Sequence, residues 1–143
     1  MSDAAWEIEH SVETAASLAF AWAYMTNVAN WDDPPAEFKL YGPFAEGSYG
    51  TTQMPGQEPR RWQIREVNPL ECYRLEFPLE GATLSFVWRV HPLPAGGTRL
   101  TQSIVLEGEC ANAYLARVQP AFTPNLAPGM KRIAAAIELA EAK

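Results

Sequence analysis

The stretch RRWQIREVNPLECYRLEFPLEGATLSFVWRVHPLPAGGTRLTQSIVLE, residues 60–107, decides the fold of this protein. It consists of four runs in which apolar and polar residues alternate, separated by short segments rich in Pro, Gly and Asn. These connections are too short to hold crossover helices, so consecutive strands must be antiparallel. The runs expected to form strands are 60–67, 72–77, 82–91 and 98–107.

Three further runs extend this sheet toward the N-terminus. In residues 5–12, glutamates and serine alternate with a second set of side chains, which is typical of a half-buried strand. That second set consists of Trp6, Ile8, His10 and Val12. Residues 37–41 and 48–54 are two more short runs. The sequence therefore predicts seven antiparallel strands.

A short helix is expected between the first two strands. Ser17 stands where an N-cap is expected, and Leu18–Thr26 has helical composition. Asn27–Trp31 adds a short turn of helix. The segment Asp32-Asp33-Pro34-Pro35 ends it, because the residue before a proline disfavours the helical region.

The last third of the chain returns to helix. Ala111–Gln119 predicts a short helix ended by Pro120, and a long helix is expected from Pro128 to about Ala142. The buried stripe of the long helix would consist of Met130, Ile133, Ile137 and Ala140. Because one long helix covers only part of a seven-stranded sheet, the sheet must curve around it, which tends to leave a hollow. Small side chains facing the sheet favour that hollow, and those expected to do so are Ala134, Ala135 and Ala136.

The composition is that of a globular protein. The chain has 143 residues, of which 48% are hydrophobic and 20% charged, and this suits one domain over residues 1–143. The net charge of −6 disfavours nucleic acids and anionic membranes as partners, because both require a basic face. The acidic N-terminus is unlike a secretory signal, and the uncharged run Thr14–Trp31 is too polar to insert into a membrane. Two cysteines, Cys72 and Cys110, lack Cys-x-x-Cys spacing and are expected to be reduced, in a cytoplasmic protein.

Several short motifs, taken in their order and spacing, resemble the START-like (SRPBCC) helix-grip superfamily, which includes polyketide cyclases/dehydrases and lipid-transfer domains. These motifs are Ala16-Ser17 with Trp22, Thr26-Asn27 before Trp31, Gly42-Pro43 with Gly47, Glu66-Val67-Asn68-Pro69, Gly97-Thr98-Arg99-Leu100-Thr101 and Pro128-Gly129-Met130-Lys131. The resemblance runs from about Trp6 to Ile137. It implies an α+β fold in which a curved seven-stranded antiparallel sheet wraps around a long C-terminal helix, with a short helical insert after the first strand. It also implies a cavity for an apolar or amphipathic small molecule, without implying one reaction.

His10 is the most informative polar residue. Its parity on the first strand places it among apolar side chains, and Gln102 on the last strand shares a face with leucines and isoleucine. In the resembling fold these two strands are neighbours. His10 and Gln102 are then expected to form a polar pair inside an apolar cup, which could orient a ligand or donate a proton. The alternative is a core histidine satisfied by a neighbouring amide or water.

Aromatic side chains on the alternating faces of the strands form the second candidate group. They are Trp62, Tyr73, Phe77, Phe86 and Trp88, and Met130 on the long helix completes the candidate ligand-binding set. Such residues suit a cavity for flat or ring-rich ligands, since they offer large contact areas and edge-to-face packing. The alternative is a plain packed core, which is the commoner use of aromatic residues.

The remaining polar features indicate no further site. Arg60, Arg61 and Arg65 are expected on a solvated face. The glycines from Gly42 to Gly50 are followed by no Lys and no helix, which argues against a phosphate loop. No metal-ligand spacing occurs, so neither a metal nor a cofactor is predicted, and nothing in the sequence indicates an oligomeric state.

Three hypotheses about function follow. The first is a carrier or sensor that binds a small apolar or aromatic ligand in an internal cavity. The second is an enzyme of the polyketide cyclase or dehydratase type, with His10 as acid/base and Tyr73 or Gln102 holding a carbonyl. The third is a protein-interaction module, since some relatives resemble chaperone co-factors; it would require a sizeable exposed apolar patch. The sequence does not decide whether the protein is an enzyme.

Overall fold

The computed structural model describes residues 4–31 and 35–143. Its central feature is a seven-stranded sheet in the order β1-β7-β6-β5-β4-β3-β2. The strands are β1 (Ala4–Thr14), β2 (Glu37–Tyr41), β3 (Tyr49–Gln53), β4 (Arg60–Asn68), β5 (Cys72–Leu79), β6 (Ala82–Pro92) and β7 (Thr98–Glu107). All six pairs of neighbouring strands are antiparallel, and β1 lies beside β7. The predicted α+β helix-grip fold is therefore confirmed.

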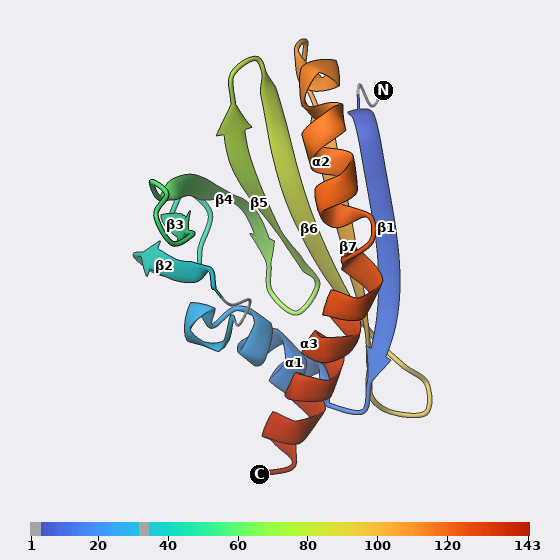
Figure 1. Ribbon diagram of the computed structural model, residues 1–143. Helices are drawn as coiled ribbons and strands as arrows, with labels where there is room; N and C mark the ends of the chain where they lie inside the picture. The colour runs from blue at the N-terminus through green and yellow to red at the C-terminus, as the bar shows by residue number, and fades with distance from the viewer. Residues whose placement is uncertain (1–3, 32–34) are drawn as a thin grey trace.

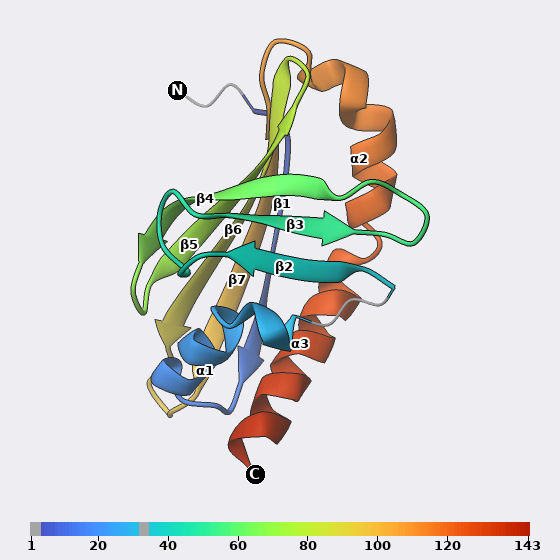
Figure 2. The same ribbon diagram turned by 90° about the vertical axis from the view of Figure 1, so that its left-hand side faces the viewer.

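Helices follow β1 and β7. The first group is α1 (Leu18–Met25) with the short 3₁₀ helix η1 (Val28–Asn30), and the second is η2 (Ala111–Tyr114), α2 (Leu115–Phe122) and α3 (Leu126–Glu141). In Figure 1, α2 and α3 run one after the other down the molecule beside β1. The sheet is strongly twisted, so that β2, β3 and β4 run across the direction of β6 and β7 (Figure 2). The pairing of β4 with β5 shifts in register between Ile64 and Glu66.

Alternation assigns the strand residues to two faces. The concave face, toward the helices, carries the buried core, including Ile64 on β4 and Ile104 on β7. The outer face carries charged side chains, among them Glu9 on β1 and Arg89 on β6. Because successive side chains of a strand point to opposite faces, the positions of these residues follow from the sequence alone.

Local signals place α1 and α3 against β1. Ser17 is the N-cap of α1, and its hydroxyl accepts a hydrogen bond from the backbone N–H of Phe20 at 3.2 Å. The buried hydroxyl of Thr14, at the end of β1, donates to the carbonyl of Ala134 in α3 at 3.2 Å. These contacts fix the end of β1 to the middle of the long helix.

Two predictions about the C-terminal helices were wrong, and the start of the long helix differs by two residues. Pro120 lies inside α2 instead of ending it, and Phe122 is the last residue of that helix. The long helix begins at Leu126, so Pro128 falls in its first turn, where the missing N–H would have no helical partner. Ala134 is buried, but Ala135 and Ala136 are exposed, because residues one and two positions further along a helix turn away from the buried face.

Two further expectations concern segments outside the sheet. The segment at which the first helical region was expected to end, Asp32-Asp33, lies outside the described residues. Within the part of the chain that the structure describes, no helix is long and apolar enough to cross a bilayer.

Candidate functional site

A row of four polar side chains crosses the concave face of the sheet. His10 on β1 lies directly opposite Gln102 on β7, Gln102 lies opposite Trp88 on β6, and Trp88 lies opposite Tyr73 on β5. Directly opposed residues of antiparallel strands have Cβ atoms about 4.5–5.5 Å apart. Each of these four side chains therefore lies next to the one on the neighbouring strand. We call His10, Gln102, Trp88 and Tyr73 the polar row.

No hydrogen bond to residues 4–31 or 35–143 is formed by the side chains of the polar row. Among the residues that the structure describes, no hydrogen bond joins the His10 imidazole to the Gln102 amide or to any other group. The same holds for the Trp88 indole and the Tyr73 hydroxyl. No completely buried side-chain nitrogen or oxygen in this part of the chain lacks a partner. The polar atoms of the row therefore retain contact with open space, and His10 and Gln102 are half-buried although they face inward.

The register thus places His10 opposite Gln102, as predicted, but no hydrogen bond joins the two side chains. A strand on each side of β7 flanks Gln102, so its remaining exposure comes from the concave side. Phe86, on the next central strand, is half-buried in the same way. Both side chains therefore keep part of their surface accessible in the middle of the sheet.

Tyr73 ends the polar row in apolar surroundings. Its side chain is only 3% exposed and packs edge-on against Trp22 (ring centroids 6.1 Å apart) and Phe44 (5.0 Å). Burial raises the pKa of the Tyr73 hydroxyl above its ordinary value, because the phenolate would lose its hydration. The hydroxyl is therefore a neutral hydrogen-bond donor throughout the physiological range.

The other predicted aromatic residues differ in their surroundings. Trp62 is 1% exposed, its indole N–H donates to the Thr52 hydroxyl at 3.1 Å, and its ring packs on Trp31. A Cβ at Gly50, opposite Trp62 on β3, would overlap that ring. Trp62 is thus enclosed and satisfied by its neighbours. Met130 on α3 is also almost fully buried.

Phe77 and Phe86 form a second aromatic group with Phe122 of α2. The rings meet edge to face, with centroids 5.4 Å apart in both contacts. Phe122 was missed at the sequence level because Pro120 was expected to end the helix before it. Trp22 and Phe44, which pack on Tyr73, were also missed as site residues, although Trp22 belongs to one of the motifs that carry the family resemblance.

The concave face is almost free of charge. The buried residues of the described segments include no Asp, Glu, Lys or Arg. Along the strands, Arg60 shares the parity of Trp62, but it is the first residue of β4 and is exposed. The polar row therefore consists of neutral hydrogen-bonding groups surrounded by apolar side chains.

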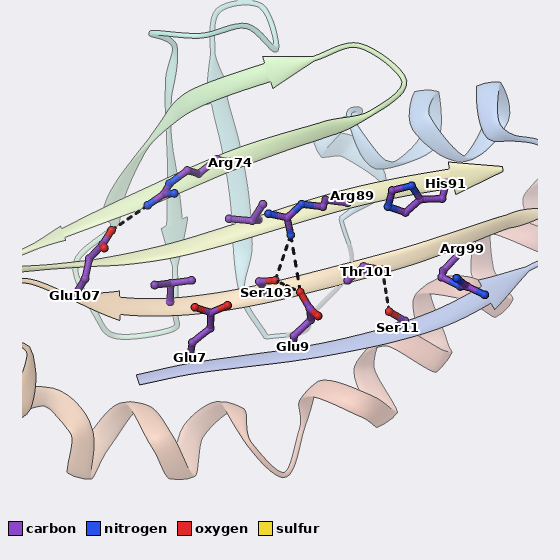
Figure 3. A pocket seen from close by; sticks show the side chains of 12 residues that line it. Glu7, Glu9, Ser11, Arg74, Arg89, His91, Arg99, Thr101, Ser103 and Glu107 are labelled. Carbon is purple, nitrogen blue, oxygen red and sulfur yellow. Dashed lines mark hydrogen bonds and ion pairs between the residues drawn. The ribbon is translucent and has the colours of Figure 1, made fainter. Parts of the chain in front are cut away.

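The outer face of the sheet has a different character. An open groove of about 570 Å³ lies over β1, β7, β6 and β5 (Figure 3). Several of its charged groups pair with one another: Arg74 pairs with Glu107 at 3.0 Å, and Arg89 lies 3.9 Å from Glu9. A second hollow of about 370 Å³ lies beside Leu70 at the β4–β5 turn. Neither of these two hollows lies between the sheet and α3, and the mutual pairing in the groove leaves few groups free for a ligand.

Comparison with known proteins agrees with this architecture. The family described as polyketide cyclase / dehydrase and lipid transport matches residues 5–138. No curated protein matches the sequence. Solved structures with a similar fold include norcoclaurine synthase from Thalictrum flavum, with 16% identity, a TM-score of 0.72 and coverage of 96% of this chain and 87% of that chain. Another is the Zhui aromatase/cyclase from a Streptomyces species, with 16% identity, a TM-score of 0.71 and 93% coverage of each chain. A structural-genomics protein from Nitrosomonas europaea has 13% identity, a TM-score of 0.73 and coverage of 96% and 97%. At these identities the likeness concerns the fold.

Proposed function

The chain belongs to the polyketide cyclase / dehydrase and lipid transport family, and we propose that it binds a small hydrophobic ligand on the concave face of its sheet, as a carrier or sensor. The polar row is the observation that carries this proposal. Polar groups facing an apolar interior normally find protein partners, because an unmade hydrogen bond there is costly. Here the four side chains of the row keep their hydrogen-bonding capacity, which a ligand could use.

The surroundings of the row support the same function. Ligand sites are mostly apolar, with a few polar groups that fix orientation. The two aromatic groups, around Tyr73 and around Phe86, supply apolar surface near the row. Face-on and edge-on contacts with such rings favour a ring-containing ligand over a simple chain.

A fluorescence titration tests the proposal. The uncharged probe N-phenyl-1-naphthylamine should bind native protein near one equivalent and quench tryptophan emission, since Trp88 lies in the row. Gln102→Phe, which places a ring over the row, should abolish binding. Gln53→Phe, an equally large change at an exposed position of β3, should leave it intact.

The proposal fails if the native protein does not bind the probe, or if the Gln102→Phe variant binds the probe as tightly as the wild type does. Thermal melts of both variants verify that they are folded. Native mass spectrometry of the purified protein would then identify a ligand that co-purifies.

One observation favours an enzyme of the cyclase type as a second candidate. Imidazole is the side chain whose ordinary pKa lies nearest neutral pH, and His10 carries the one imidazole on the concave face. A ligand held by Gln102 and Tyr73 would lie within reach of it. The interaction-module hypothesis has less support. The large apolar side chains exposed in the described segments, Tyr41, Met54, Leu70 and Leu139, are scattered along the chain.

A further inference from the structure

We propose that the outer face of the sheet carries a second binding site, which holds the phosphate group of a small soluble phosphate monoester and packs its apolar substituent beside Leu70. The side chains that would hold the phosphate are Arg89, His91, Arg99 and Thr101, at one end of the open groove over β1, β7, β6 and β5. We call these four residues the outer site. It lies on the opposite face of the sheet from the polar row, so it goes beyond the proposed function and does not depend on it.

The strand register brings the four side chains of the outer site together. His91 on β6 lies directly opposite Arg99 on β7. Arg89 lies directly opposite Thr101 in the same pair of strands. One inward-facing residue separates the two positions on each strand, so the four side chains project from the corners of a rectangle of about 5 by 7 Å. Figure 3 shows them around one end of the groove.

The two arginines of the outer site keep most of their hydrogen-bonding capacity. The Arg89 guanidinium lies 3.9 Å from the Glu9 carboxylate and donates a long hydrogen bond of 3.4 Å to the Ser103 hydroxyl. Arg99 contacts Glu13 through one nitrogen at 3.3 Å. A guanidinium carries five N–H donors, and these contacts use one nitrogen of each. Both arginine side chains are about half exposed, at 46% and 50%, so the remaining donors are accessible to a ligand.

His91 contributes a third basic group. Within residues 4–31 and 35–143 its exposed imidazole makes no hydrogen bond and no ion pair. When it is protonated, it lies opposite the guanidinium of Arg99, and like charges at directly opposed positions repel each other. An anion bound between the two groups would remove this repulsion. The Thr101 hydroxyl, which is bonded to the Ser11 hydroxyl at 2.8 Å, adds a polar atom beside them.

A phosphate group fits these donors better than a carboxylate does. The N–H groups of a guanidinium match the spacing of phosphate oxygens. A phosphate monoester has three strongly accepting oxygens, enough for all three basic groups at once, whereas a carboxylate has two. The net charge of −6 opposes approach to an anionic membrane, which favours a soluble ligand over a lipid.

A second hollow beside the outer site offers space for the substituent of the ester. It has a volume of about 370 Å³, and Arg89 and His91 line both this hollow and the groove. Its apolar surface includes Leu70, whose side chain is 45% exposed. Leu70 is also the non-glycine residue with a positive φ, 64°, among the described residues, a conformation that leucine adopts only at a cost. Packing inside the protein does not offset this cost, but contact with an apolar group of a ligand would.

An NMR titration of the full chain tests the outer site, with phenyl phosphate and inorganic phosphate as probes at pH 6.5 and low ionic strength. Both should shift the backbone amide signals of Arg89, His91 and Thr101 saturably. Phenyl phosphate should bind roughly 3–10-fold more tightly than inorganic phosphate, because its ring buries apolar surface beside Leu70. Both affinities should fall in 0.5 M NaCl, since exposed charges are screened by salt.

Three variants connect binding to the named residues. Arg89→Gln should weaken both probes at least about fivefold, because it removes a charged donor. Arg132→Gln removes the same charge from an exposed position of α3 and should leave both affinities as in the wild type. Leu70→Gly should abolish the advantage of phenyl phosphate while leaving the affinity for inorganic phosphate unchanged. Glycine adopts the φ of this position without strain, so the variant should fold.

The proposal is overturned if neither probe shifts these amide signals saturably. Equal weakening in Arg89→Gln and Arg132→Gln would also overturn it, since net charge would then govern binding. Equal affinities for the two probes, or an unchanged preference in Leu70→Gly, would show that the hollow beside Leu70 takes no substituent. Sedimentation with vesicles containing phosphatidic acid, lost in Arg89→Gln, would identify a membrane lipid as the source of the phosphate and would contradict a soluble ligand.

Discussion

At the scale of single residues, His10 separates the two ligand-binding hypotheses. It faces the concave side beside Gln102 and makes no hydrogen bond within the described segments. A carrier uses such a group only to orient its ligand, and an amide can replace an imidazole for that purpose. An enzyme that uses it as acid or base requires proton transfer, which an amide does not provide.

His10→Gln should therefore leave ligand affinity within a few-fold of wild type if the protein is a carrier. If the protein catalyses a reaction on the same ligand through His10, the rate should fall roughly 10²–10⁴-fold while binding persists. His91→Gln is the matched control, because His91 is exposed on the outer face of the sheet (Figure 3). Equal loss of affinity in both variants would contradict the placement of His10 in the site.

At the scale of elements, the start of α1 depends on the far end of the chain. A capping box requires Glu or Gln at the third helical position, but that position is Phe20. Glu141 at the end of α3 takes this role: its carboxylate accepts hydrogen bonds from the Ser17 backbone N–H at 3.1 Å and from the Ser17 hydroxyl at 3.0 Å. Glu138 likewise accepts from the backbone N–H of Ala15 at 2.7 Å. The last turn of α3 thus holds the β1–α1 junction.

Glu141→Ala should lower the free energy of unfolding by about 0.5–1.5 kcal/mol, because it removes both hydrogen bonds to Ser17 at a solvent-exposed site. Leu139→Ala is the control in the same helix: that side chain is 63% exposed and takes no part in the junction. Urea unfolding followed by circular dichroism measures both. Equal stability of the two variants would show that Glu141 does not stabilise the junction.

At the scale of the whole molecule, β1 is a long strand at the edge of the sheet, beside β7. Such an edge is a template for pairing with another chain. The outer face of β1 carries Glu7, Glu9 and Glu13, so two copies paired edge to edge would bring glutamates together. Within one molecule, Arg89 and Arg99 partly compensate these charges. We therefore interpret the acidic row as protection against association of sheets.

Replacing Glu7, Glu9 and Glu13 together by Thr should promote self-association, since Thr favours strands and the repulsion is removed. Sedimentation velocity over a range of concentrations should show a mass that rises with concentration for this variant more than for wild type. The control replaces Glu46, Glu58 and Glu80, which are exposed and lie off both edge strands, and removes the same charge. If the two variants sediment alike, net charge and not the edge of β1 governs association.

Much of this architecture was predictable because its signals are local. Period-two alternation and turn residues identified all seven strands, with ends within about two residues for most of them. Alternation also placed His10 and Gln102 on the inward face, since side chains of a strand alternate whatever the strand packs against. Ser17 was identifiable as an N-cap because this signal is also local: its hydroxyl accepts a hydrogen bond from Phe20, only three residues further along the chain.

Tertiary structure alone decided which of these groups found partners. Glu141 contacts Ser17, and Phe122 packs on Phe86, only because α2 and α3 run beside β1 in the folded molecule. The exposure of Ala135 depends in the same way on how α3 is rotated against the sheet. The polar row kept its free hydrogen-bonding groups while Trp62 found Thr52. The alternation of side chains along a strand depends only on adjacent residues. Which polar groups find hydrogen-bond partners depends instead on distances between segments that come together only on folding.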